Sequence, residues 1–207
     1  MCGFIGYINK NESNNDHYKK KFNFFYNDQV HRGPDYSEEF LVKDSNFTLN
    51  FGFNRLAIID LSSKANKIFK TENNLLLFNG EIYNAKKLKD KYLVDEEFET
   101  KTDTEVLFKL LTIKGLDIIN KLEGIFSFAF LDLNKKTISL CKDFTGTKPL
   151  YYFLNDDGFF FSSEADFLYS LTKKELDDYA LNYYFSFGFS PLDRTLVKGV
   201  NKVCPSQ

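Results

Sequence analysis

Short apolar segments recur along the chain, and their internal alternation constrains its fold more than any other feature. In 47–53 every second residue is Phe or Leu, and 124–133 holds phenylalanines spaced two apart. A period of two is typical of strands with one buried face. Turn residues at 134–136 and 155–158 separate neighbouring segments, which predicts hairpins. The sequence therefore predicts roughly seven or eight strands, mostly in antiparallel pairs. The segments concerned are 4–8, 47–53, 75–78, 124–133, 137–141, 150–154 and 159–162.

Helical patterns are fewer and lie between these segments. The predicted helices are 16–30, 102–115 and 177–187, and the Asn/Lys-rich stretches 9–15 and 62–74 are predicted loops. In the clearest helix, Thr102 with Glu105 predicts a capping box, and Gly115 predicts the end. Strands joined mainly by hairpins, with helices interspersed, favour an α+β layered fold. No Pro/Gly-rich linker divides the chain, so a single domain over residues 1–207 is predicted.

Charge and composition argue against several classes of function. The net charge is -2 at pH 7 and the lysines are scattered among acidic residues, so no surface for nucleic acid or an anionic membrane is expected. No apolar run approaches the roughly 20 residues that span a bilayer, and the N-terminus lacks the pattern of a signal peptide. A cytoplasmic protein is therefore expected. The three cysteines are widely separated, which favours neither a disulfide framework nor a metal site.

The opening sequence Met-Cys-Gly leaves two interpretations of Cys2. In the first, Cys2 is a small apolar residue at a chain end. In the second, Met1 is removed, and Cys2 then carries a thiol and a free α-amine on one residue. The ordinary pKa values of a thiol, about 8.5, and of an α-amine, about 7.7–8.0, are close enough for the amine to accept the thiol proton without a histidine. Gly3 would let backbone and substrate approach such a nucleophile closely.

Five further motifs stand out because each is unusual at its location. They are HRGPD (31–35), NRLAIIDLS (54–62), FNGEIYN (78–84), KTDTE (101–105) and KDFTGTKPLYY (142–152). Each alone has a structural explanation. Asn79-Gly80 is typical of a tight turn, Asp103 in a first helical turn interacts favourably with the helix dipole, and Arg55 can be a surface charge. Taken singly, these residues do not establish a functional site.

In this order behind Met-Cys-Gly, the motifs resemble the glutaminase domain of class II glutamine amidotransferases, which are N-terminal-nucleophile hydrolases. Within that group the chain is most similar to the glutaminase domain of glutamine-hydrolysing asparagine synthetase. The resemblance runs from Cys2 to about Pro205. It implies one type-2 glutamine amidotransferase domain over residues 1–207. It also implies an α+β fold, a four-layer αββα sandwich of two mainly antiparallel sheets.

The resemblance also implies a role for each matching residue. Cys2 is the implied nucleophile, and Asn79 and Gly80 are the implied oxyanion hole, through the Asn side-chain amide and the Gly backbone N–H. Arg55 matches the position that binds the substrate α-carboxylate, which suits a bidentate guanidinium. Asp103 and the neighbourhood of Glu81 match the positions that receive the α-ammonium. The residues implied to line the pocket are Leu56, Ala57, Ile58 and Ile59.

The predicted function is hydrolysis of L-glutamine to glutamate and ammonia, which is supplied to an asparagine synthetase-type amidation of aspartate, a sugar or another acceptor. No cofactor and no metal are expected in this domain. The Ser-Gly-Gly-x-Asp-Ser phosphate loop of the ATP-pyrophosphatase domain is not in the sequence. ATP and Mg²⁺ are therefore expected only in a separate or missing synthetase domain or subunit that accepts the ammonia. The alternative is a catalytically inactive glutaminase-like domain that binds glutamine or acts as a scaffold.

Several positions depart from the family pattern. Phe53 and Asn54 replace the His-Arg that usually precedes the binding arginine, and Glu38 stands where a glycine is usual. None of these changes removes a catalytic group, so activity remains the expectation. His31 is predicted to position a loop by hydrogen bonding, and Cys141 to pack in the core.

Overall fold

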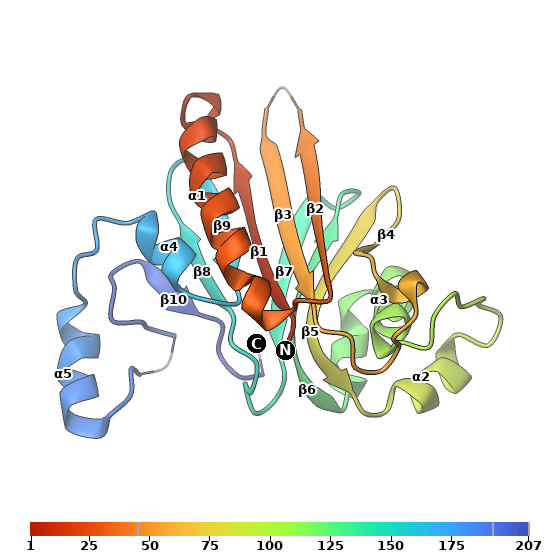
Figure 1. The fold of residues 1–207 in the computed structure, drawn as a ribbon. Helices are drawn as coiled ribbons and strands as arrows, with labels where there is room; N and C mark the ends of the chain where they lie inside the picture. The colour runs from red at the N-terminus through yellow and green to blue at the C-terminus, as the bar shows by residue number, and fades with distance from the viewer. Residues whose placement is uncertain (45, 192, 207) are drawn as a thin grey trace.

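Two antiparallel sheets lie face to face in the computed structural model, and helices cover the outer face of each sheet (Figure 1). The structure describes residues 1–44, 46–191 and 193–206. The larger sheet holds, in spatial order, β10 (Val200–Lys202), β8 (Tyr151–Leu154), β9 (Gly158–Ser162), β1 (Gly3–Asn9), β3 (Thr48–Arg55) and β2 (Tyr36–Lys43). The smaller sheet holds β4 (Phe69–Lys70), β5 (Asn74–Ile82), β6 (Gly124–Asp132) and β7 (Thr137–Lys142). The helices are α1 (Asn15–Asp28), α2 (Ala85–Tyr92), α3 (Asp103–Lys114), α4 (Asp166–Ser170) and α5 (Asp178–Phe187).

The core between the two sheets follows the predicted alternation. Phe51 and Phe53 of β3 and Phe4 of β1 face the smaller sheet, where they pack with Leu75 and Leu77 of β5. All five side chains are buried. Burying a side chain of this size contributes roughly 1.5–3 kcal/mol, so this layer holds the sheets together. The predicted α+β fold with αββα layers is confirmed.

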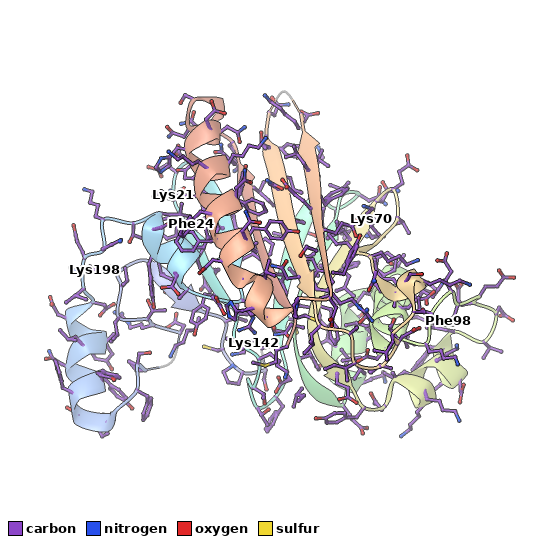
Figure 2. All side chains as sticks on the ribbon, viewed as in Figure 1. Lys21, Phe24, Lys70, Phe98, Lys142 and Lys198 are labelled. Atoms are coloured by element: carbon purple, nitrogen blue, oxygen red, sulfur yellow. The ribbon has the colours of Figure 1, made fainter. Side chains whose placement is uncertain are left out.

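Helix α1 covers the outer face of the larger sheet. Ile5 and Tyr7 of β1 pack against Tyr18 and Phe22 of this helix, so these two aromatic side chains are buried. Not every aromatic residue fills the core, because Phe24 on the outer side of α1 is 65% exposed (Figure 2). The anchored helix places the 31–35 motif, which follows it, beside the start of β1.

Strand β6 is buried on both faces. Phe126, Phe128 and Phe130 point toward α2 and α3, as their spacing predicts, whereas Ala129 and Leu131 point into the layer between the sheets. A strand covered on both sides is expected to be apolar almost throughout. The predicted hairpins β6–β7 and β8–β9 are confirmed by their antiparallel pairing.

Strand β5 corrects one prediction from the sequence. The expected end at Asn79-Gly80 is wrong, because the strand continues to Ile82 and Gly80 pairs with Phe126 of β6. Gly80 adopts φ +153°, and a Cβ atom there would lie 2.2 Å from the Ile125 carbonyl oxygen. The glycine therefore serves a close approach between two strands rather than a turn.

Some elements were not predicted from the sequence. Strand β2 at the edge of the larger sheet and helix α2 were missed. The predicted loop 62–74 contains β4 and a 3₁₀ turn, Ser63–Ala65. The predicted loop 9–15 likewise contains the 3₁₀ turn Glu12–Asn14 and the first residue of α1. Among the described residues, no helix combines the length and apolar character that crossing a membrane requires.

Helix α3 forms where the sequence predicts it. The Thr102 hydroxyl accepts a hydrogen bond from the Glu105 backbone N–H at 3.2 Å, and the helix ends before Gly115 at φ 70°. Only half of the expected capping box is present, because the Glu105 carboxylate accepts from the N–H groups of Glu99 and Thr100 instead. The cap fixes Asp103 at the helix start, beside the end of β5.

Candidate active site

The predicted site residues come from four elements that meet at one end of the sandwich. Cys2 directly precedes β1, and Arg55 ends β3, which pairs with β1. Asn79 lies in β5 of the opposite sheet, and Asp103 begins α3. All four residues line one cavity of about 120 Å³. A single water molecule needs about 10–15 Å³ of such space, so the cavity has room for a small molecule.

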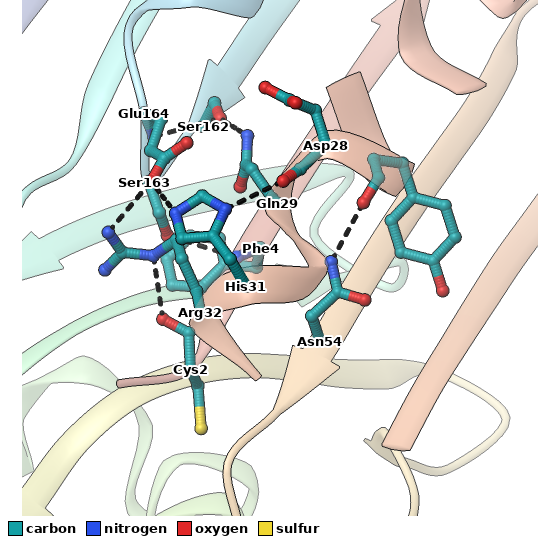
Figure 3. Close-up of polar contacts among 11 residues, drawn as sticks. Cys2, Phe4, Asp28, Gln29, His31, Arg32, Asn54, Ser162, Ser163 and Glu164 are labelled. Atoms are coloured by element: carbon teal, nitrogen blue, oxygen red, sulfur yellow. Dashed lines mark hydrogen bonds and ion pairs between the residues drawn. The ribbon is translucent and has the colours of Figure 1, made fainter. Parts of the chain in front are cut away.

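The thiol of Cys2 lies in the wall of this cavity. The Leu56 backbone N–H donates to its Sγ at 3.4 Å, and Figure 3 shows the sulfur pointing away from Arg32. Burial raises the pKa of the Cys2 thiol, while the Leu56 N–H acts in the opposite direction. Met1 lines the same cavity, and burial lowers the pKa of its α-amine. With Met1 in place, the nitrogen of Cys2 is a peptide nitrogen.

Asn79 presents an unused hydrogen-bond donor. Its side chain is buried, and its Nδ2 has no hydrogen-bond partner among the described residues. A buried amide without a partner is costly, and in native proteins it calls for an explanation such as a bound ligand. The neighbouring Gly80 lines the cavity with backbone alone. The pair can therefore offer a side-chain N–H and a main-chain N–H to one oxygen atom.

Arg55 supplies a buried positive charge. It is 7% exposed; its Nη1 donates to the Asn66 side-chain oxygen at 2.7 Å, and its Nη2 donates to the Asp60 carbonyl oxygen. These two bonds fix the guanidinium and also hold the 56–66 segment. No carboxylate forms an ion pair with Arg55 within the described part of the chain. A buried cation of this kind favours an anionic ligand.

Asp103 supplies the opposite charge. It is 8% exposed and accepts a hydrogen bond from the Ile82 N–H at 2.7 Å. Burial raises the pKa of the Asp103 carboxyl to about 6, and the nearby negative charge of Glu81 contributes to this rise. The backbone N–H groups that donate to the carboxylate act in the opposite direction and lower the pKa. No cation forms an ion pair with Asp103 in the ranges that the structure describes. Together with Arg55, this carboxyl gives the cavity the two charges that a zwitterion needs.

The 54–62 motif forms the rim of the cavity. Leu56, Ile58 and Ile59 line it, and Ile58 is 70% exposed, so the rim is open to solvent. Ala57 does not line the cavity; its backbone N–H donates to the Asp35 carboxylate at 2.7 Å. The 31–35 motif therefore fixes the backbone of the rim through the carboxylate of Asp35.

Some cavity residues were not predicted. Lys148 lines the cavity near Met1 and belongs to the 142–152 motif, which was a signal that it could be functional. Phe69 and Ile125 also line it, but they lie in or beside ordinary strands and nothing in their sequence context distinguishes them. Among the described residues, no group of three or more His, Cys, Asp or Glu side chains could hold a metal ion.

Comparisons with known proteins agree with this geometry. Residues 1–207 match a family model described as a glutamine amidotransferase domain. The chain is 34% identical to glutamine-hydrolyzing asparagine synthetase 1 of Bacillus subtilis over 99% of its own length and 32% of that protein. It is 36% identical to glutamine-hydrolyzing asparagine synthetase of Homo sapiens over 63% of its own length and 23% of that protein. The chain spans less than half the length of the curated relatives it matches.

A solved structure shares the fold at lower sequence similarity. The glutamine phosphoribosylpyrophosphate amidotransferase of B. subtilis, complexed with ADP and GMP, superposes with a TM-score of 0.61 at 18% identity. The match covers 100% of this chain and 50% of that chain. At this identity the likeness shows the fold alone, and it agrees with the αββα layers described above.

Proposed function

Because the chain belongs to the glutamine amidotransferase domain family, we propose that it hydrolyses L-glutamine to glutamate and ammonia, with Cys2 as the nucleophile. One observation carries the proposal. The sulfur of Cys2 and the unpartnered amide of Asn79 share a small cavity with a buried cation, Arg55, and a buried carboxyl, Asp103. Free glutamine has the matching groups: an α-carboxylate, an α-ammonium and a side-chain carboxamide.

Binding is assigned to the two charged residues. Arg55 receives the α-carboxylate through its planar guanidinium, and Asp103 receives the α-ammonium in its ionised form. Truncating one partner of such a desolvated charge pair costs roughly 2–5 kcal/mol. The exposed rim residues Ile58 and Ile59 flank the entrance and exclude water once the substrate is bound.

Chemistry is assigned to Cys2 and its own α-amine. Removal of Met1 frees this amine, which takes the thiol proton as Sγ attacks the carboxamide carbon. Asn79 Nδ2 and the Gly80 N–H donate to the oxyanion, an interaction for which one donor contributes roughly 2.7–4 kcal/mol. The intermediate collapses as the amine returns the proton to the leaving ammonia. Water then hydrolyses the thioester by the same steps and releases glutamate.

The fate of the ammonia is part of the proposal. The asparagine synthetases that the chain resembles are longer, and we assign the acceptor reaction to a synthetase domain or subunit that binds ATP and Mg²⁺. The acceptor is aspartate or, in a related reaction, a sugar or another molecule. We place the reaction in the cytoplasm, where a nucleophilic thiol such as that of Cys2 stays reduced.

Replacement of the nucleophile tests the proposal. Cys2→Ala is expected to abolish ammonia release from glutamine and to leave the fold intact, whereas the control Cys204→Ala is expected to leave the rate unchanged. Intact mass with and without 6-diazo-5-oxo-norleucine reports both loss of Met1 and labelling of Cys2. Ammonia release from Cys2→Ala at the wild-type rate would overturn the proposal. Wild-type protein that binds glutamine without releasing ammonia would favour the alternative, an inactive binding or scaffolding module.

A further inference from the structure

A second polar network lies behind Cys2, on the side away from the cavity, and the proposed mechanism does not use it. It joins the 3₁₀ turn that follows α1 (Gln29–Arg32), through Gln29 and Arg32, to residues 162–164 at the end of β9 (Figure 3). The residues that they bring into contact are 132 to 133 positions apart in sequence, so only the fold places them together.

Cys2 needs this network because it lies just outside the sheet. The pairing of β1 with β3 begins at Gly3, so the ladder of hydrogen bonds does not fix the residue before it. The Cys2 carbonyl accepts instead from Arg32 Nε at 3.3 Å. A Cβ atom at Gly3 would lie 3.0 Å from Arg32 Cδ, so the glycine makes room for this side chain. The carbonyl, the thiol-bearing Cβ and the nitrogen all branch from the same Cα, so fixing the carbonyl orients both proposed reacting groups.

Arg32 is itself held by one carboxylate. Its side chain is 9% exposed, and its Nη1 forms an ion pair with Glu164 Oε1 at 3.2 Å. A guanidinium this buried needs a counter-charge to offset its desolvation. Figure 3 shows the carboxylate on the far side of Arg32 from Cys2. The exposed ring of His31 contacts the same Oε1 from outside at 3.1 Å, as expected of a residue that positions a loop.

Glu164 is fixed by the chain around it. Its backbone N–H donates to Ser162 Oγ at 3.2 Å, and Gln29 Nε2 donates to the same hydroxyl at 2.8 Å. Ser163 Oγ accepts from the Phe4 N–H at 3.1 Å, which ties the segment to the beginning of β1. The backbone that bears this carboxylate is therefore tied to β1, the strand that directly follows Cys2.

We propose that Glu164 is a positioning residue for the Cys2 nucleophile and that it acts through Arg32. The inference rests on the proposed function. Glu164 does not line the cavity, so its loss should affect the alignment of the thiol and amine and leave the binding of glutamine unchanged.

Steady-state kinetics of variants test this role. Glu164→Ala is expected to lower kcat for ammonia release 10- to 100-fold while KM changes less than twofold. The rate of Cys2 labelling by 6-diazo-5-oxo-norleucine should fall by a similar factor. Glu164→Gln, which keeps an acceptor for Arg32 but no charge, should be intermediate. Glu175→Ala, which removes a carboxylate from an exposed ion pair with Lys198, is the matched control and should keep the wild-type kcat.

A double-mutant cycle separates positioning from general destabilisation. If Glu164 acts through Arg32, then Arg32→Ala with Glu164→Ala should lower kcat no more than Arg32→Ala alone. Additive losses of kcat in the double variant would overturn the inference. It would also be overturned if melting temperature and circular dichroism show that Glu164→Ala loses kcat because it unfolds, while Glu164→Gln keeps full kcat. An active wild type with unchanged kcat in Glu164→Ala overturns it as well. A wild type that releases no ammonia contradicts the proposed function instead.

Discussion

Arg55 and Asp103 are buried charges of opposite sign in one cavity, and neither has an ion-pair partner among the described residues. A structural role would pair them with oppositely charged side chains of the protein, because an unpaired buried charge is costly. The pKa of Asp103, raised to about 6 by burial, records that cost. The glutamine that we propose as substrate would supply both missing partners, so its binding would offset both buried charges at once.

Glutamine binding is expected to weaken in acid because of Asp103. As the pH falls through 6 its carboxyl becomes protonated and no longer attracts the α-ammonium, so the Kd should rise about tenfold between pH 7 and pH 5. Calorimetry on the Cys2→Ala protein measures this without interference from turnover. In Cys2→Ala with Asp103→Asn, the Kd should be high and nearly independent of pH. A Kd that stays constant from pH 5 to 7 in the protein with Asp103 would show that this carboxyl does not bind the ligand.

Several residues of the cavity wall could be singled out from the sequence, but not their surroundings. Arg55 and Asp103 stood out through their motifs, and the structure places both in the cavity wall. Phe69 and Ile125 contribute to the same wall from positions that only the folded sheets bring near. Ala57 was expected to line the pocket with its neighbours, yet its N–H turns back to Asp35. The direction of each residue in an irregular rim depends on such local bonds, which no spacing rule captures.

At the scale of elements, the least obvious feature is the distorted pairing of β5 with β6. Gly80 and Gly124 both have positive φ, +153° and +159°, and a Cβ at either would meet a carbonyl oxygen of the other strand. The pair Asn79-Gly80 therefore belongs to a strand whose backbone is pulled close to its neighbour. The same dipeptide favours a turn when only local sequence is considered, so the correct assignment required the partner strand.

Gly80→Ala is expected to lower kcat about 100- to 1,000-fold, because the added Cβ displaces the backbone N–H that we assign to the oxyanion hole. Gly115→Ala is the matched control. Gly115 also has positive φ, at 70°, but no atom lies within 4 Å of its Cβ position and it ends α3 away from the cavity. At φ 70° and ψ −163°, a conformation that essentially only glycine adopts, the alanine should cost about 1–3 kcal/mol of stability and leave kcat unchanged. Equal kcat in the two variants, measured on folded protein, would contradict the role of Gly80.

Elements with a strong apolar pattern were predictable, and those held mainly by tertiary contacts were not. Helix α3 buries five apolar side chains behind a capped start, whereas α2 is lysine-rich and buries only Leu88 among its described residues. Strand β2 alternates half-buried and exposed positions at the sheet edge. The sequences of such elements show little hydrophobic periodicity, because the stability of these elements comes from the neighbours that they pair with or pack against.

At the scale of the whole molecule, the order of strands escaped prediction although the layers did not. β1 lies between β3 and β9, so residues 5–9 pair with 158–162, which lie far away in the sequence. Local patterns predict strands and hairpins, but they do not specify such distant partners. This long-range pairing also brings residues 162–164 behind Cys2, so the network around Glu164 could not be inferred from any motif.

Residues of both sheets line the cavity. Arg55 comes from the larger sheet, Asn79 from the smaller sheet, and Asp103 from helix α3, which covers the smaller sheet. Glutamine bound there should therefore stabilise the folded molecule as a whole. At a glutamine concentration of 100 Kd the gain is about 2.7 kcal/mol, which corresponds to a rise in Tm of roughly 5–10 °C for a chain of this size. Thermal unfolding of Cys2→Ala measures the rise, and adding Arg55→Ala should remove most of it at the same glutamine concentration. An equal rise in both proteins would mean that glutamine binds elsewhere, since a ligand held between the sheets cannot lose its carboxylate partner without losing affinity.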